Sequence, residues 1–432
     1  MLALSWVAAQ ILPSCAKADP PSSSSPSPSP SRSLSSSQAQ HKPAVAAAGA
    51  QQQSAPTPLE PLAVEDTIVV VAEIVLPSHA DTRGVCFGGQ ILSWIDLTAG
   101  IAAKKLARGP CVTASVDSVQ FLKPSVVGDV IILSAMVNRT FNTSMEIGVR
   151  VETESMRSGE RKYCCSAYLT FVSIDAQGRP APVRQVIPQS ADESRRYSHA
   201  QLRRQQRLER RSRGEVIIPL EWNCFDDGHQ LSKSLLPANE LDQVPRRYAK
   251  QTLAHMTQVV LPGNANTVGV TFGGDIMAWI ERCAYISASR LCRNVHLLSA
   301  SVDSLHFLNP TRVGDIVYIT SMVTAAFTSS IEVLISVYGE NPLTGDIKHC
   351  NDAFMTLVTV DESGVPLRIS NKFTPESETE LARQRDSIAR RELRLRARQK
   401  LRRNSNESIQ QQILHVRRRS SDSNGLSAAP VQ

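Results

Sequence analysis

Residues 75–96 read VLPSHADTRGVCFGGQILSWID, and residues 260–281 read VLPGNANTVGVTFGGDIMAWIE. The two stretches align without a gap. Within this shared frame the polar residues differ, because Asp81 corresponds to Asn266 and Asp96 to Glu281. A duplicated scaffold whose polar residues are not matched predicts one composite site, built from both copies.

The repeat extends well beyond these stretches, with one inserted residue in the second copy. Similarity over this length indicates two copies of a whole domain rather than a solenoid of short units. The further matching pairs are TASVDSVQFLKPSVVGD (113–129) with SASVDSLHFLNPTRVGD (299–315), FNTSMEIGVRV (141–151) with FTSSIEVLISV (327–337), and SAYLTFVSIDAQGRPAPV (166–183) with DAFMTLVTVDESGVPLRI (352–369).

Each copy follows the same order of predicted elements. A β-rich segment (68–76) leads through a Gly-Gly loop into residues 89–107, where Ile91, Trp94 and Ile95 recur at helical spacing. Several alternating, β-branched runs follow, separated by turn residues. The predicted fold class is therefore α+β: two tandem domains, each an antiparallel sheet wrapped around a central helix.

Composition divides the rest of the chain. We expect a disordered or targeting low-complexity segment over 1–62, because its Ser/Pro/Ala/Gln composition cannot bury enough surface to order itself. The first domain is predicted over 65–180 and the second over 248–368. A charged linker with a helix spans 187–245, and a basic tail, first helical and then disordered, spans 376–432.

The net charge of +7 comes mostly from two Arg-rich runs, 194–214 and 383–403. We interpret both as solvated helices, with contact to a phosphate-bearing ligand as the alternative. Tyr197 is the one Phe, Tyr or Trp residue in these runs, so a nucleic-acid partner is not expected. No apolar run is long enough for a membrane span.

Nine cysteines occur without a C-x-x-C pair, and the histidines form no H-E-x-x-H motif. We therefore expect reduced thiols, no metal site and no cofactor. A cytoplasmic location follows, with a mitochondrial or plastid location as the alternative if the acid-poor N-terminal segment is a transit peptide.

The Gly-Gly pairs, Gly88–Gly89 and Gly273–Gly274, precede the predicted helices in both copies. Glycine there permits close backbone approach and leaves amide groups at a helix N-terminus, where the dipole favours developing negative charge. That arrangement suits an oxyanion hole. A tight turn that needs glycine only for steric reasons is the alternative.

Two polar residues are candidates for chemistry. Asp96 lies about two turns into an otherwise apolar helix, where a carboxylate needs either a partner or a function. Asn266 lies in the loop before the second Gly-Gly pair and could orient a water or a carbonyl, although a loop Asn often serves only as a turn former.

Together these residues resemble the acyl-CoA thioesterases of the double hot-dog type. The resemblance covers about 65–180 and 248–368. Among those enzymes the chain is most similar to the cytosolic and brown-fat members that also carry a lipid-binding START domain. Too few residues follow 376 for that domain, so lipid-regulated behaviour is not expected. The motifs that carry the resemblance are RGVCFGGQILSWIDLTAG, PCVTASVDSVQF, NRTFNTSMEIGVRV, HMTQVVLPGNANTVGVTFGGDIMAWIE and SASRLC.

The resemblance implies a catalytic pair, with Asp96 placed by W-I-D and Asn266 placed by A-N-x-x-G. The opposite pair, Asp81 and Glu281, lacks the amide and is predicted to be weak or inactive. Acyl-CoA would be the substrate, and assembly into homo-oligomers, as trimers of double hot dogs, is implied as well. The implied CoA contacts are Ala114, Ser115, Val116, Thr143, Ser144, Met145, Arg204, His306, Phe307 and Leu308, with Arg204 meeting a phosphate.

Two other functions stay open at this stage. A hot-dog hydratase or dehydratase would use a histidine near the helix start, where this chain has Phe87 and Phe272, while His79 occurs in one copy only. A non-catalytic acyl-CoA-binding regulatory protein would bind the thioester without releasing CoA. The sequence therefore predicts an acyl-CoA thioesterase, and measurement of CoA release would separate it from both alternatives.

Overall fold

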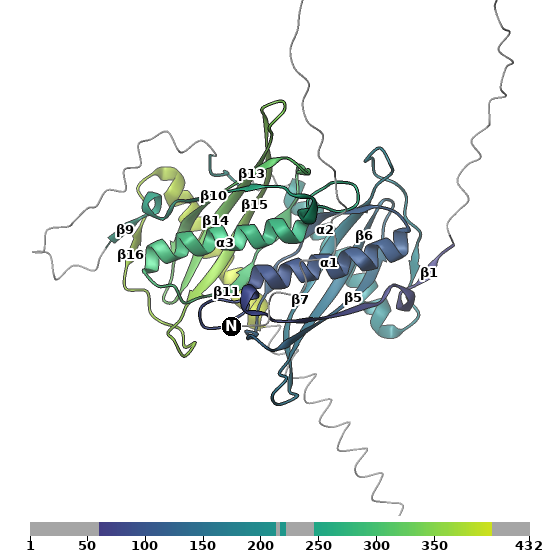
Figure 1. The fold of residues 1–432 in the computed structure, drawn as a ribbon, viewed down its shortest axis with the longest axis horizontal. Coiled ribbons are helices and arrows are strands. Elements are labelled where there is room, and N and C mark those ends of the chain that lie inside the picture. Colours follow the sequence, from purple (N-terminus) through teal and green to yellow (C-terminus); the bar gives the residue numbers. More distant parts are fainter. Residues whose placement is uncertain (1–59, 213–216, 222–245, 400–432) are drawn as a thin grey trace, which may run out of the picture. The chain divides into compact units, whose positions relative to one another are not determined.

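The computed structural model describes residues 60–212, 217–221 and 246–399. Within them, two six-stranded antiparallel sheets each wrap around one long helix (Figure 1). The predicted α+β class with tandem hot-dog domains is confirmed. Nearly all of the predicted low-complexity segment and the Ser-rich end of the tail lie outside the described residues.

The elements of the first repeat begin shortly before its sheet and end with the linker helix. In chain order they are β1 (Leu62–Ala63), η1 (Glu65–Thr67), β2 (Val69–Ile74), η2 (Pro77–His79), α1 (Gly88–Ala107), β3 (Cys111–Val116), β4 (Val119–Gln120), β5 (Val130–Thr140), β6 (Ser144–Glu154), β7 (Arg161–Ser173), β8 (Val186–Ile187) and α2 (Ala191–Ser212).

The second repeat follows the same order. Its elements are β9 (Arg246–Tyr248), η3 (Ala249–Thr252), β10 (Ala254–Val259), η4 (Pro262–Asn264), α3 (Gly273–Cys292), β11 (Leu297–Val302), β12 (Leu305–His306), β13 (Ile316–Ala326), β14 (Ser330–Asn341), β15 (Asp346–Thr359) and β16 (Lys372–Thr374). A further helix spans 378–399.

The two sheets exchange short edge strands. The first sheet has the order β12-β3-β7-β6-β5-β2, and the second has the order β10-β13-β14-β15-β11-β4. Thus β12 of the second repeat pairs with β3, and β4 of the first repeat pairs with β11. The ranges predicted for the two domains therefore each contribute a strand to the other domain's sheet.

Alternation along the strands explains why each helix is buried. On β5, Ile131, Leu133, Ala135 and Val137 are fully buried and alternate with more exposed neighbours. The helix face opposite them is built from small and branched residues such as Ala99 and Ala102, which are also fully buried. Small side chains let a helix lie close to the inner face of a sheet. The apolar residues of α1 therefore pack against the sheet.

The two long helices touch each other at their glycine-rich starts. A Cβ atom on Gly89 would lie 2.8 Å from the Cα of Ala278, and one on Gly274 would lie 2.7 Å from the Cα of Ser93. Such distances are shorter than real contacts of Cβ atoms allow. Glycine is therefore required at both positions by the close approach of α1 and α3.

The Arg-rich helix α2 lies against the outer face of the first sheet. Glu146 of β6 is fully buried there and accepts from the guanidinium of Arg203 at 2.5 Å. The next turn of α2 brings Arg207 to Asp117 at 2.9 Å. These two arginines connect the linker helix to the buried Glu146 and to the half-buried Asp117, which lies between β3 and β4.

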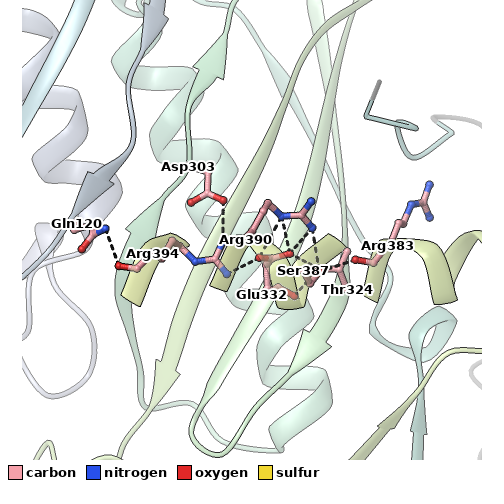
Figure 2. Close-up of polar contacts among 8 residues, drawn as sticks. All are labelled: Gln120, Asp303, Thr324, Glu332, Arg383, Ser387, Arg390 and Arg394. Carbon is pink, nitrogen blue, oxygen red and sulfur yellow. Dashed lines mark hydrogen bonds and ion pairs between the residues drawn. The ribbon is translucent and has the colours of Figure 1, made fainter. Parts of the chain in front are cut away.

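The helix over 378–399 makes the same contacts with the second sheet, as Figure 2 shows. Arg390 reaches the fully buried Glu332 at 2.6 Å, and Arg394 bridges Asp303 at 2.8 Å and Glu332 at 2.5 Å. The interpretation of both Arg-rich runs as solvated helices was therefore wrong for these residues. Each glutamate faces the helix that covers the outside of its sheet, and the arginines there offset the cost of burying its charge.

Removing one of these arginines should destabilise the fold. Arg394→Ala would leave Asp303 without its ion pair and Glu332 with only Arg390. We expect a loss of about 3 kcal/mol in the free energy of unfolding, because breaking a buried ion pair strands a charge. Urea unfolding would measure the loss. The matched control is Arg396→Ala, since Arg396 lies on the same helix in an exposed pair with Glu392 at 3.8 Å and should change stability by less than about 0.5 kcal/mol. Equal losses in the two variants would contradict the prediction.

Candidate active site

The carboxylate of Asp96 lies at the start of the opposite helix. Asp96 is only 3% exposed, and its Oδ2 accepts a hydrogen bond from the Gly274 N–H at 2.9 Å. Its Oδ1 accepts from the hydroxyl of Thr113 on β3 at 2.8 Å. Asp96 of the first repeat therefore caps the helix of the second, where the helix dipole favours a negative charge.

Burial raises the pKa of Asp96 to about 6, above its ordinary value of 3.8. The hydrogen bonds from Thr113 and Gly274 act in the opposite direction, because they stabilise the carboxylate. A carboxyl group balanced in this way is mostly ionised at neutral pH and can still take up a proton. That property is what general base catalysis requires.

Asn266 lies in the loop before α3 and is partly buried. Its Oδ1 accepts from the backbone N–H groups of Val268 and Val270, each at 3.1 Å. The side chain therefore forms the turn that its residue type favours. Its amide Nδ2 donates to no other residue in the described part of the chain, so this donor is available to a ligand.

Asp96 and Asn266, from different repeats, line one cavity of about 350 Å³. Thr113, which donates a hydrogen bond to Asp96, and Gly273, at the start of α3, also line this cavity. The structure thus brings together two residues, one from each repeat, that the sequence pointed to separately. The walls are mostly apolar and include Leu97, Ile101, Phe171, Phe272, Ile276 and Phe307.

The opposite polar pair has a different environment. Glu281 accepts from the N–H groups of Gly88 at 2.8 Å and Gly89 at 2.5 Å, and from the hydroxyl of Ser299. Asp81 forms an ion pair with Arg83 at 2.8 Å. The carboxylates of Glu281 and Asp81 therefore both accept hydrogen bonds from other groups of the protein.

The Gly-Gly amides were expected to be open donors for an oxyanion. In the structure, the amides of Gly88 and Gly89 are both bonded to Glu281, and the amide of Gly274 is bonded to Asp96. The physical reason is that buried N–H groups at a helix start need acceptors, and the opposite helix supplies a carboxylate. Gly273 is the residue of these four that lines the cavity.

Two groups of residues expected at CoA are brought together across the repeats. The Phe307 N–H donates to the Ala114 carbonyl at 3.0 Å, and both residues line the cavity. Next to them, Ser115 pairs with His306 and Val116 with Leu305. Leu308 follows on the exposed surface.

The other expected CoA contacts lie on the first repeat alone. Ser144 pairs with Val172, a residue of the cavity wall, while Met145 is fully buried and pairs with Phe171. Thr143 accepts a backbone hydrogen bond from Ser173 at 3.0 Å. On α2, the guanidinium of Arg204 lies 4.5 Å from the centre of the Phe141 ring, just before this hairpin turn. Arg204 is therefore placed beside the 143–145 segment and outside the cavity.

Sequence reasoning missed Thr113. The signal was present, because TASVD and SASVD place a hydroxyl side chain at the same point of both repeats, Thr113 and Ser299. Each of these hydroxyl groups donates to the helix carboxylate of its own repeat, Asp96 or Glu281. A hydroxyl group that recurs beside a recurring acid is the signal that could have found Thr113, the third polar side chain at the candidate site.

The described residues hold no group of His, Cys, Asp and Glu side chains suited to a metal ion. Their cysteines are free thiols, and the adjacent Cys164 and Cys165 are both buried. Among the same residues, no helix combines the length and the apolar character of a membrane span.

The two sheets, each wrapped around one long helix, define a double hot-dog protein. Residues 83–160 and 268–345 both match the model of the thioesterase superfamily. An acyl-CoA thioester hydrolase of Bacillus subtilis (strain 168), YkhA, is 35% identical over 153 residues, which are 35% of this chain and 89% of that protein. The chain belongs to the thioesterase superfamily.

Longer relatives match both repeats at once. Acyl-coenzyme A thioesterase 11 of Mus musculus is 36% identical over 333 residues, covering 76% of this chain and 53% of that protein. The chain thus spans about half the length of this relative. Among solved structures, an acyl-CoA hydrolase from Bacillus cereus is 34% identical and covers 36% of this chain and 94% of its own, with a TM-score of 0.35.

Replacing Asp96 by Asn should make the protein more stable at neutral pH. The folded pKa of about 6 lies above the ordinary 3.8, so the wild type loses stability as pH rises from about 4 to 6. The amide cannot ionise, and it can still accept from Gly274 and donate to Thr113. We expect Asp96→Asn to gain about 2–3 kcal/mol at pH 7.5 and almost nothing at pH 4. Thermal or urea unfolding at both pH values would test this, and an equal effect at the two values would contradict it.

Proposed function

We propose that this protein hydrolyses acyl-CoA thioesters to a free carboxylic acid and CoA. The observation that carries the proposal is the meeting of Asp96 and Asn266, one from each repeat, in a single apolar cavity. The thioesterase family membership supplies the bond that is cleaved. Apolar walls suit an acyl chain, and the two polar groups suit its thioester.

In the proposed reaction, the thioester carbonyl lies at the start of α3. The positive end of the helix dipole there, beside Gly273, would stabilise the charge that develops on the carbonyl oxygen. The Nδ2 group of Asn266 would donate to that oxygen or to the attacking water. Both contributions act on the transition state more than on the ground state.

Asp96 would act as the general base. Its carboxylate removes a proton from water, the resulting hydroxide attacks the carbonyl carbon, and the C–S bond breaks to release the CoA thiolate. The proton held by Asp96 then passes to the thiolate. Direct attack by Asp96 would instead form a mixed anhydride that water cleaves in a second step.

The hydratase alternative needs a histidine at the site. In the cavity wall, the residue directly before the start of α3 is Phe272. His79 packs edge-on against Trp94 at 5.1 Å, and its Nδ1 accepts from the Leu76 N–H. These placements favour hydrolysis. A non-catalytic regulatory protein would bind acyl-CoA and release no CoA.

Binding of the CoA portion would use the segments gathered at the edge of the cavity. We infer that 114–116 and 306–308 contact the pantetheine arm, and that 143–145 and Arg204 contact the nucleotide and its phosphates. Arg204 is suited to this role because its ring contact with Phe141 leaves the guanidinium beside the 143–145 turn.

The remaining proposals concern assembly and location. We propose a homo-oligomer of three double hot dogs, which light scattering after gel filtration would measure. We also propose a cytoplasmic location, because buried free thiols suit a reducing compartment. A mitochondrial or plastid signal from a fluorescent fusion of the full chain would contradict it.

The central test combines a substrate panel with two variants. A series from acetyl-CoA to palmitoyl-CoA, with thiol release as the readout, should show turnover by the wild type. We expect Asp96→Ala and Asn266→Ala each to lower kcat by at least about 100-fold, because each removes a group that acts on the transition state. Asp81→Asn, at the opposite pair, serves as the control and should keep most of the rate. Wild-type rates in both site variants would contradict the assignment.

The pH profile tests the roles of Asp96 and Thr113 together. Because the base must be ionised, kcat/KM should rise with pH and reach half of its plateau near 6. Thr113→Val removes a hydrogen bond that lowers the pKa of Asp96, so the rise should move to higher pH. Thr113→Ser keeps the hydroxyl and should keep the profile. An unchanged midpoint in Thr113→Val would show that Thr113 does not set the pKa of Asp96.

A further inference from the structure

We propose that each chain binds one acyl-CoA because Tyr285 fills the counterpart of the cavity in the opposite half, while Gly100 leaves the cavity beside Asp96 open. The identity of the ligand rests on the proposed function. The number of ligands per chain rests on the geometry alone.

Gly100 lies on α1 at the wall of the cavity, between Leu97 and Ile101, which also line it. A Cβ atom at this position would meet the ring of Phe171 at 3.7 Å, an ordinary contact. A methyl group therefore fits at residue 100. A large side chain would extend into the space that Phe171 and Gly100 border.

Tyr285 occupies the equivalent place on α3, since the two helices start in the same frame and have the same length. Its ring packs edge-on against Phe87, with 6.3 Å between centres. Phe87 corresponds to Phe272, which lines the open cavity. The hydroxyl of Tyr285 donates to the Val295 carbonyl, so both ends of this side chain are held.

An ion pair closes the same region from the other side. Arg83, which corresponds to Val268, binds Asp81 at 2.8 Å, and the side chains of these two residues are only 11% and 5% exposed. The guanidinium also donates to the Asp361 carbonyl at 3.5 Å. Burial raises the pKa of Tyr285, the charge of Asp81 raises it further, and the charge of Arg83 lowers it.

The two halves therefore differ in bulk as well as in catalytic groups. Where the open half has Gly100, Val268 and Asn266, the opposite half has Tyr285, Arg83 and Asp81. A ligand entering there would have to displace an aromatic ring and break a largely buried ion pair. Both costs oppose binding before any question of catalysis arises.

Binding stoichiometry is the test, measured by titration calorimetry with a non-hydrolysable thioether analogue of an acyl-CoA. The wild type should bind one equivalent per chain. Gly100→Tyr should weaken binding at least about 10-fold or abolish it, as expected when a cavity is filled. Gly100→Ala adds only a methyl group, in ordinary contact with Phe171, and should weaken binding less than Gly100→Tyr does. Thermal unfolding of all variants shows whether they are folded.

The reverse change opens the other half. Tyr285→Ala combined with Arg83→Val should add a second, weaker binding event, bringing the total toward two equivalents. Tyr285→Phe keeps the ring, loses only the hydroxyl and should stay at one equivalent. Two equivalents in the wild type, none in the wild type, or one in the folded double variant would each overturn the proposal.

These outcomes are independent of the proposed hydrolysis. A wild type that binds one equivalent and releases no CoA from any substrate would remove the proposed function and leave this inference standing. A wild type that hydrolyses acyl-CoA and binds two equivalents would do the reverse.

Discussion

Each long helix of this protein begins against the other, and each start is capped by a carboxylate from the other. The buried N–H groups at a helix start have no partner within their own helix. Asp96 supplies the acceptor for Gly274, and Glu281 supplies it for Gly88 and Gly89. Glycine at these points is fixed by the approach of one backbone to the other. The two repeats are joined by this contact, and the site is located where they join.

The two caps are equivalent in position and different in reach. The longer side chain of Glu281 meets two backbone amides and a serine hydroxyl, which satisfies it with protein donors. The shorter side chain of Asp96 meets one backbone amide and one hydroxyl while lining the cavity. Glu281 and Asp96 differ by one methylene group. Both cap a helix start, and Asp96 also borders the cavity.

Much of the fold could be predicted from the sequence because the information was local and repeated. The ungapped match around the Gly-Gly pairs, and the helical spacing of Ile91, Trp94 and Ile95, indicated two domains with a central helix. The partner of each carboxylate could not be predicted, because Asp96 and Gly274 are distant in the chain and meet only where the two helices contact each other. The exchange of β4 and β12 was hidden for the same reason, since two-residue strands carry no periodic pattern.

The Arg-rich helices show where composition misleads. A run such as RRQQRLERR is polar all round and resembles a solvated helix, yet Arg203 and Arg207 face a buried glutamate and an aspartate of the sheet. The decisive residues were the glutamates, because Glu146 and Glu332 sit at the same place in both repeats, each between two apolar neighbours, and are fully buried. A repeated charge on the outer face of a strand indicates a repeated cation to cover it.

The contacts that hold the two repeats together occur in both halves, whereas the residues that would meet a ligand differ between the halves. The helix caps, the hydroxyl donors on β3 and β11, and the arginine pairs on the outer faces are all present twice. In contrast, Asn266 corresponds to Asp81, Gly100 to Tyr285 and Val268 to Arg83 in the alignment of the two repeats. A duplicated fold needs both of its helix contacts to stay folded, whereas one open cavity is enough for turnover. The second half can therefore replace an open space with a ring and an ion pair while the contacts shared by both halves are kept.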